Sequence, residues 1–191
     1  MPPSQSAALP PRSRASRAAP SPGKPRAAGA ARGGRGRREL RLSVPGRGEI
    51  VVRHLLLDLN GTLAVEGRIP PAVRRRLARV AARLSVRVLT ADTFGTARAE
   101  LRGLPVRLER AATARAKSLV ARSLAAEGVA AMGNGANDVP MLRGAALGIA
   151  VLGREGMDGR LAAAADVVVA RPEDGIDLLL RPRRLVATLR R

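Results

Sequence analysis

The sequence predicts an α/β fold: a three-layer sandwich in which helices cover both faces of a mostly parallel central sheet. Two observations support this prediction. From about residue 39 onward, short apolar runs typical of buried strands alternate with amphipathic segments of helical period. Polar residues follow several of these strands, and ligands bind at the carboxyl ends of strands in such sheets.

Residues 1–38 differ from the rest of the chain in composition. They are rich in Pro, Arg, Ala, Ser and Gly, with nine basic side chains and no acidic one. Such a segment buries too little apolar surface to offset its ordering entropy, so we expect a disordered basic tail. Residues 39–191 should form one folded domain.

The charge of the chain invites a nucleic-acid hypothesis. The formal net charge is +20, and residues 39–191 keep +11, from 26 basic and 15 acidic residues. Almost every cation is Arg, with Lys only at positions 24 and 117, which indicates a compositional bias along the whole chain. Nucleic-acid binding through the tail therefore stays a second alternative, and nucleic acid is not the expected partner.

Composition excludes other classes. The chain has no Cys, which excludes a disulfide framework and a thiolate metal site. No apolar run reaches the roughly 18 residues of a membrane span, and no apolar stretch follows the basic N-terminus as in a secretory signal. We expect a cytoplasmic protein without a membrane partner.

The elements follow in order along the domain. Residues 40–44 alternate, residues 45–48 form a turn, and residues 49–57 are apolar enough for strands, which predicts a β-hairpin that leads into a buried strand ending at Asp58. Pro70 and Pro71 open a helix, Thr113 caps another, and Gly128 ends it. We expect helices at 70–84, 96–101, 113–127, 139–145, 161–164 and the C-terminus, and strands at 86–89, 106–108, 129–132, 147–151 and 167–169.

Polar segments at the predicted strand ends suggest phosphate chemistry. They are DLNGT at 58–62, Thr90-Ala91-Asp92, and GNGAND at 133–138, with Lys117 on the helix before the last of these strands. A carboxylate such as Asp58 can attack phosphorus and form an aspartyl phosphate. Thr90 offers donors to a phosphate oxygen, and Lys117 offers a compact positive charge.

The same segments supply the oxygen ligands that Mg²⁺ prefers. These are the carboxylates of Asp58 and Asp138, the main-chain carbonyl of Asn60 and the side chain of Asn134. Gly61 would let the backbone approach a ligand closely. Residue usage points the same way, since Asn occurs only at positions 60, 134 and 137, all inside these segments.

DLNGT, LTAD, Lys117 and GNGAND together resemble, in order, the four motifs of the haloacid dehalogenase superfamily. They are most similar to the phosphorylation domain of P-type ATPases and to soluble P-type ATPase-like phosphatases. The resemblance covers about residues 40–191 and implies a hydrolase domain there, with Mg²⁺ as cofactor.

The resemblance also implies roles. Asp58 would be the phosphorylated nucleophile and a Mg²⁺ ligand, and Lys117 the charged catalytic residue. Thr62, Thr90 and Ala91 would hold the phosphate together with Lys117. The Mg²⁺ end would contain Asn134, Asn137 and Asp138, while Gly61 and Asp92 would support the site.

Three departures from the family pattern limit these expectations. Many phosphatases of the superfamily have Asp as general acid and base where this chain has Asn60, and the metal-side GDG becomes Gly133-Asn134-Gly135. An amide cannot move a proton, and loss of general acid–base catalysis costs about 10²–10⁴-fold in rate. Only about thirty residues separate Asp58 from Thr90, so no cap domain fits.

The expected function is a Mg²⁺-dependent phosphohydrolase, slowed by Asn60, that acts on a phosphorylated small molecule or phosphoprotein. The first alternative is a catalytically weak or inactive phosphate-binding regulatory module. Oligomerisation stays open, because a neighbouring subunit can cover a capless site. Simpler interpretations remain: Asp58 as a helix cap, Lys117 as an exposed lysine, His54 as a core or edge residue, and residues 153–158 as a surface loop.

Overall fold

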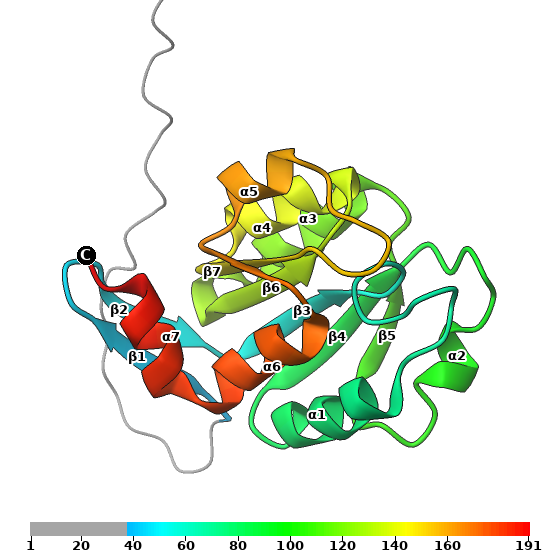
Figure 1. Ribbon diagram of the computed structural model, residues 1–191, viewed down its shortest axis with the longest axis horizontal. Coiled ribbons are helices and arrows are strands. Elements are labelled where there is room, and N and C mark those ends of the chain that lie inside the picture. Colours follow the sequence, from blue (N-terminus) through cyan, green and yellow to red (C-terminus); the bar gives the residue numbers. More distant parts are fainter. Residues whose placement is uncertain (1–37) are drawn as a thin grey trace, which may run out of the picture.

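The computed structural model describes residues 38–191 (Figure 1). The predicted tail, residues 1–38, thus lies outside the described residues except for Arg38. The described part is an α/β sandwich with a six-stranded parallel sheet and an N-terminal antiparallel hairpin, which confirms the predicted fold class. None of its helices is long and apolar enough to cross a membrane.

The central sheet has the strand order β5-β4-β3-β6-β7-β8, and every neighbouring pair is parallel. A parallel order of this kind requires a crossover between successive strands, and helices supply most of the crossovers. The strands are β3 (His54–Asp58), β4 (Ser85–Thr90), β5 (Arg107–Arg110), β6 (Val129–Gly133), β7 (Leu147–Val151) and β8 (Val167–Val169).

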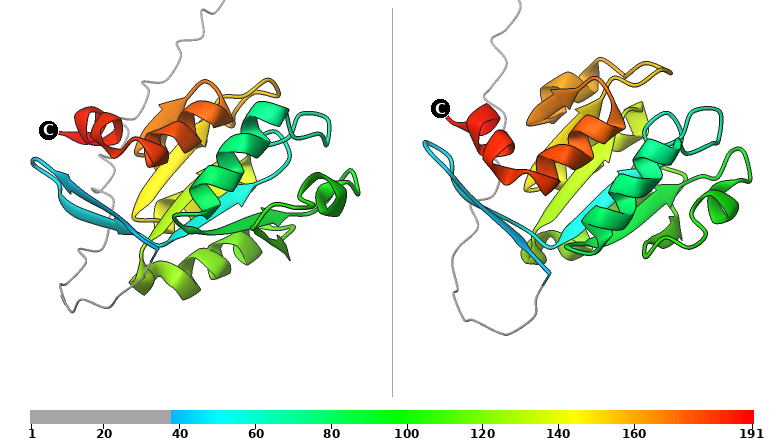
Figure 2. Two further views of the ribbon diagram at one scale, coloured as in Figure 1. Left: turned by 90° about the horizontal axis from the view of Figure 1, so that it is seen from below. Right: turned by 60° about the horizontal axis from the view of Figure 1, so that its bottom comes forward.

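Two hydrophobic cores fill the space between the sheet and its helices. On one face, α1 (Pro71–Ala81), α6 (Pro172–Leu180) and α7 (Pro182–Leu189) pack over strand residues such as Leu55 and Leu57. On the other face, α3 (Ala114–Leu124), α4 (Val139–Gly144) and α5 (Arg160–Ala164) pack over Leu56. The alternation along β3 follows from the two-residue period of a strand. Figure 2 shows α1 and α6 side by side across one face.

The hairpin consists of β1 (Leu40–Val44) and β2 (Gly48–Val52), a two-stranded sheet separate from the central one. It lies beside α7, and the backbone N–H of Arg191 donates to the Pro45 carbonyl at 3.2 Å. The hairpin therefore joins the first and last described segments of the domain.

Several predicted boundaries shift by a few residues. The first helix ends at Ala81, so Leu84 is buried but lies beyond it. The strand expected at 106–108 is β5 at Arg107–Arg110, and the helix expected at 96–101 is the single turn α2 (Ala97–Glu100). The helix capped by Thr113 ends in a 3₁₀ turn, η1 (Ala125–Glu127), followed by Gly128 at φ +93°.

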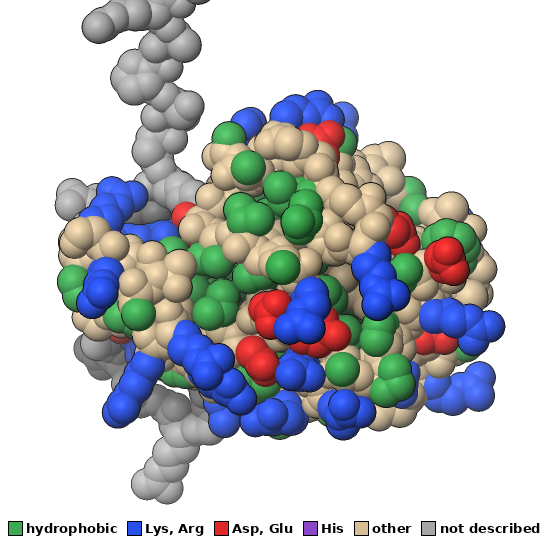
Figure 3. Space-filling view, in the orientation of Figure 1, with side chains coloured by type: hydrophobic (Ala, Val, Ile, Leu, Met, Phe, Trp, Pro, Cys, Tyr) green, Lys and Arg blue, Asp and Glu red, His purple; other side chains and the backbone are tan. Residues whose placement is uncertain are grey.

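Charged side chains are mixed on the surface. On the face shown in Figure 3, Lys and Arg side chains lie among Asp and Glu side chains. Along the lower edge of this face Lys and Arg side chains predominate, with Asp and Glu side chains nearer its centre.

Candidate active site

Strand register brings three of the predicted segments to one edge of the sheet. Asp58 is the last residue of β3 and lies opposite Leu89, so Thr90 follows on the neighbouring strand β4. On the other side, Leu57 lies opposite Met132, and residues 133–138 follow β6 at the same edge. The carboxyl ends of adjacent parallel strands therefore hold the polar residues singled out in the sequence.

A buried lysine joins two carboxylates at this edge. The Nζ atom of Lys117 donates to Asp58 Oδ1 at 2.5 Å and to Asp138 Oδ1 at 2.7 Å. Lys117 is only 1% exposed, although the other cations of its helix, α3, face solvent. The interpretation of Lys117 as an exposed helix lysine is therefore wrong.

Asp138 is surrounded by donors. Its Oδ2 accepts the backbone N–H groups of Asn134 at 3.1 Å and Gly135 at 3.0 Å, in addition to the Lys117 bond at Oδ1. Its side chain is fully buried. These contacts hold Asp138 against Lys117 and the loop after β6, and its role as a Mg²⁺ ligand stays a prediction.

The ionic cluster carries net negative charge, because two carboxylates share one ammonium. Burial and the repulsion of Asp138 raise the pKa of Asp58 to about 6, against the lowering effect of Lys117 and Thr62. Burial alone would lower the pKa of Lys117, but the two carboxylates outweigh it and raise that pKa. At neutral pH the site therefore holds a buried excess of negative charge that a cation would neutralise.

Asn134 contacts both the nucleophile loop that contains Asp58 and the loop that follows β7. The Thr62 hydroxyl donates toward Asp58 Oδ2 at 3.1 Å and lies 3.0 Å from Asn134 Oδ1. On its other side, Asn134 Nδ2 donates to the Gly156 carbonyl at 3.0 Å, and the Asp158 backbone N–H donates to the Asn134 carbonyl at 2.9 Å. The side-chain amide at position 134 thus both faces the nucleophile loop and holds the loop after β7.

The loop at 153–158 is the part of the site that the sequence did not reveal. It was interpreted as a plain surface loop, yet it is tied to Asn134 and also to residue 66, whose backbone N–H donates to Glu155 Oε1 at 3.0 Å. Gly153 and Gly156, both at positive φ, were the available signal, since such backbone favours glycine.

Gly61 packs directly against Asn134. A Cβ atom at position 61 would lie 2.4 Å from Asn134 Nδ2, and the residue has φ +76°. Both the contact and the backbone conformation exclude a larger residue here. The nucleophile loop and the loop after β6 are therefore in close contact beside Asp58.

Thr90 and Asp92 lie at the end of β4, with Ala91 between them. Thr90 is 2% exposed, and its Oγ1 accepts the backbone N–H of Asp92 at 2.9 Å. Asp92 has φ +57°, and its Oδ1 accepts the backbone N–H of Ala97 at the start of α2. Asp92 thus orders the turn that follows Thr90, as expected of a supporting residue.

The two remaining asparagines make few contacts. The side-chain Oδ1 of Asn60 is buried and has no hydrogen-bond partner, next to a tight turn in which the Gly61 N–H donates to the Ala64 carbonyl. Asn137 lies half-buried in the 3₁₀ turn η2 (Ala136–Asp138). An unsatisfied buried amide oxygen is costly, so Asn60 offers an acceptor to a ligand at the site.

The residues present fit a hard divalent cation, with less charge than three carboxylates would provide. Among residues 38–191, no group of three His, Cys, Asp or Glu side chains is placed to hold a metal. The candidate ligand atoms expected from the sequence are all oxygens, of Asp58, the Asn60 main chain and Asn134, which suits Mg²⁺. The buried excess of negative charge favours such an ion as well.

Comparisons with known proteins give a family model and several relatives. A family model described as haloacid dehalogenase-like hydrolase matches residues 114–180, which include Lys117 and segment 133–138. The chain is 47% identical over 60 residues to uncharacterized protein MJ0073 of Methanocaldococcus jannaschii, covering 31% of this chain and 64% of that protein. Over 39 residues it is 46% identical to uncharacterized protein MJ0072 of the same organism, covering 20% of this chain and 89% of that protein.

Solved structures share the fold at low sequence identity. The cobalt-bound deoxy-D-mannose-octulosonate 8-phosphate phosphatase of Haemophilus influenzae superposes with TM-score 0.58 and 14% identity, over 70% of this chain and 90% of that chain. The corresponding phosphatase of Moraxella catarrhalis, solved with magnesium and phosphate, gives 0.57 and 16%, over 73% and 94%. A zinc-transporting P-type ATPase gives 0.52 and 21%, over 62% and 20%.

Proposed function

We propose that this chain, which belongs to the haloacid dehalogenase superfamily, is a Mg²⁺-dependent phosphohydrolase that acts through an aspartyl phosphate on Asp58. The observation that carries the proposal is the buried cluster of Asp58, Lys117 and Asp138 at the carboxyl end of β3. A solvated surface carboxylate needs no buried ammonium partner, whereas a carboxylate that attacks a phosphate group does.

In the first step, an Asp58 carboxylate oxygen attacks phosphorus, an O–P bond forms, and the ester P–O bond breaks. The leaving alkoxide takes a proton from solvent, because Asn60 has no proton to give. The Lys117 ammonium neutralises charge on the transferring group. Thr62 and Thr90 supply hydroxyl donors beside Asp58 and at the adjacent strand end.

In the second step, water attacks phosphorus and the bond between phosphorus and Asp58 breaks. Inorganic phosphate leaves, and the Asp58 carboxylate is restored. The attacking water must lose a proton, and the amide of Asn60 does not accept one. The proton of the water passes to solvent instead. For a good leaving group such as p-nitrophenolate, which needs no general acid, the second step is the slow one and the aspartyl phosphate accumulates.

Asp58, the main-chain carbonyl of Asn60 and the side-chain oxygen of Asn134 would hold the cation. Bound there, Mg²⁺ would supply positive charge against the phosphate oxygens. Asp138 would keep Lys117 and the Asn134 loop in place through the hydrogen bonds described above. These residue roles belong to the proposal.

The substrate class follows from the lack of a cap. Between Asp58 and α1, and between Thr90 and α3, the described residues form loops, short strands and one helical turn but no inserted domain. A phosphorylated small molecule or a phosphoprotein can therefore reach the site. The two octulosonate 8-phosphate phosphatases act on a phosphorylated sugar acid, by their names, and this chain shares their fold.

The proposal is tested by hydrolysis of p-nitrophenyl phosphate with Mg²⁺, comparing the wild type with Asp58→Asn. We expect a slow activity in the wild type that depends on Mg²⁺ and is lost in the variant. Activity that survives the substitution overturns the proposal.

A second candidate function is a phosphate-binding regulatory module with little or no turnover. The observation in its favour is the amide at position 60, with its unsatisfied Oδ1. If the wild type is inactive, Asn60→Asp separates the two. Restored turnover identifies an impaired enzyme, and continued inactivity favours the binding module.

A further inference from the structure

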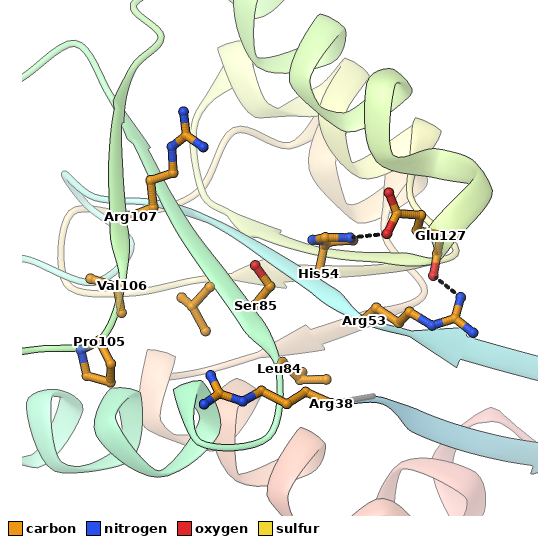
Figure 4. A pocket seen from close by; sticks show the side chains of 10 residues that line it. Arg38, Arg53, His54, Leu84, Ser85, Pro105, Val106, Arg107 and Glu127 are labelled. Carbon is orange, nitrogen blue, oxygen red and sulfur yellow. Dashed lines mark hydrogen bonds and ion pairs between the residues drawn. The ribbon is translucent and has the colours of Figure 1, made fainter. Parts of the chain in front are cut away.

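A second polar site lies at the opposite end of the sheet from Asp58. The amino-terminal ends of β3, β4 and β5 surround an open pocket of about 500 Å³ (Figure 4). Its lining includes Arg38, His54, Ser85, Pro105 and Arg107. His54 and Asp58 are the first and last residues of β3, so the two sites are about 13 Å apart along the strand.

Two guanidinium groups flank this pocket with donors to spare. Arg38 and Arg107 lie on opposite sides of it in Figure 4, with Ser85 between them and His54 to one side, next to Glu127. Arg38 uses one N–H for the Ala81 carbonyl at 3.2 Å, and Arg107 uses its Nε for Glu109 at 3.0 Å. A guanidinium has five N–H donors, so both retain capacity for an anion.

The other charges at the pocket are engaged in hydrogen bonds within the protein. Arg53 donates to Glu39 Oε2 at 3.0 Å and to the Glu127 carbonyl at 2.9 Å, and it points away from the pocket. The Glu127 carboxylate lies 3.1 Å from His54 Nε2. The unused N–H donors at the pocket therefore belong to Arg38 and Arg107.

His54 has one ring nitrogen without a partner. Its Nδ1 atom is buried and makes no hydrogen bond, while Nε2 is held by Glu127. When Nε2 donates to the Glu127 carboxylate, Nδ1 carries the ring lone pair, so His54 serves as a reporter beside the pocket and not as a donor to an oxyanion. Leu84, Pro105 and Val106 add apolar lining to the pocket, with Pro105 and Val106 on the side away from His54.

We propose that this pocket binds a small organic oxyanion, a carboxylate or a phosphate ester. Its charged head meets the free N–H groups of Arg38 or Arg107, and its apolar part lies on Pro105 and Val106. The volume suits a small molecule. The site does not depend on the proposed chemistry at Asp58, because it shares no residue with the cluster there.

His54 is the only histidine in the chain, so its imidazole gives a single NMR signal. The full-length, untagged chain is titrated with benzoate and with inorganic phosphate at constant pH, and NaCl is titrated as the ionic-strength control. We expect the ring C–H resonance of His54 to shift saturably with at least one of the two oxyanions. Asp58→Asn should behave as the wild type does, which separates this site from the active site.

The double variant Arg38→Ala with Arg107→Ala should weaken binding of the oxyanion about tenfold or more, because charge-assisted hydrogen bonds are lost. Its matched control is Arg75→Ala with Arg79→Ala, two exposed arginines on α1 outside the pocket, which should leave the affinity unchanged. A His54 signal that responds to neither oxyanion beyond the NaCl effect overturns the proposal, as does equal affinity in both double variants.

Discussion

Two groups of side chains meet at the carboxyl edge of the sheet, and they differ in charge. Asp58, Lys117 and Asp138 form a buried ionic cluster, whereas Asn60 and Asn134 are neutral amides where the resemblance to the superfamily motifs implies Asp. The ionic group provides what attack on phosphorus requires. The amide group lacks the proton transfer that fast hydrolysis requires. The contrast suggests a site that forms an aspartyl phosphate more readily than it releases one.

Removal of the shared ammonium should have the largest effect. Lys117→Met leaves two buried carboxylates facing each other, and breaking such a pair costs about 3–5 kcal/mol of unfolding free energy. Turnover should fall at least about 10²-fold, since electrostatic stabilisation is lost. Urea unfolding and phosphatase assays measure both. The control Arg115→Met, an exposed cation on the same helix, should change stability by less than about 0.5 kcal/mol; equal effects would contradict a special role for Lys117.

The role of the amide group is tested by replacing Asn60 with an acidic residue. Asn60→Asp supplies a proton donor and acceptor beside Asp58, and general acid–base catalysis is worth about 10²–10⁴-fold. We expect steady-state turnover to rise by at least about tenfold, with a smaller accumulated phosphoenzyme. Asn137→Asp adds a carboxylate to the turn η2 and serves as the control, with no gain expected. A gain in Asn137→Asp equal to that in Asn60→Asp would show that charge alone is responsible.

Burial and repulsion within the ionic cluster should make the free energy of unfolding depend on pH in the absence of Mg²⁺. Because the pKa of Asp58 in the fold is raised to about 6, its contribution is fully present below its unfolded value and is lost as the pH rises through 6. Asp58→Asn avoids this loss and should be more stable than the wild type above pH 6, by up to about 3 kcal/mol. Thermal unfolding from pH 4 to 8 measures the difference, with Glu49→Gln as an exposed control.

Added Mg²⁺ should make the wild type more stable than Asp58→Asn. A cation that neutralises Asp58 stabilises the wild type more than Asp58→Asn, so the melting temperature of the wild type should rise on addition of Mg²⁺. An identical rise in both proteins would contradict Asp58 as a ligand.

The smallest expected effect concerns Asn134. Asn134→Asp adds charge to the cation site and should tighten Mg²⁺ binding about tenfold. It also removes the Nδ2 donor to the Gly156 carbonyl, which should cost about 1 kcal/mol of stability in the absence of metal. Calorimetric titration and thermal unfolding measure the two changes. Tighter binding with no loss of stability would show that the Gly156 contact contributes little.

The sequence predicted the architecture well because its signals were local. The apolar runs that became β3, β6 and β7 ended next to polar segments, and Thr113 and Gly128 delimited α3 and its final turn. The strand β5 was misplaced by one or two residues because it lies at the sheet edge, and its charged side chains obscure the period.

Parts of the site depend on contacts that are distant in sequence and carry no local signal. The bonds from Asn134 to Gly156 and Asp158 join segments more than twenty residues apart, so the 153–158 loop looked ordinary. The burial of Lys117 likewise follows from the packing of α3 against the sheet. His54 was expected to be a core or edge residue, and its unpaired Nδ1 became visible only with its neighbours.

The central claim is that Asp58 becomes phosphorylated, and mass spectrometry tests it most directly. The chain is incubated with Mg²⁺ and p-nitrophenyl phosphate, quenched in acid, digested and mapped. We predict a single phosphoryl group on the peptide that contains Asp58, with higher occupancy in the wild type than in Asn60→Asp, and none in Asp58→Asn. Hydrolysis that proceeds while Asp58 stays unmodified in every variant, or a phosphoryl group on another residue, would contradict the account.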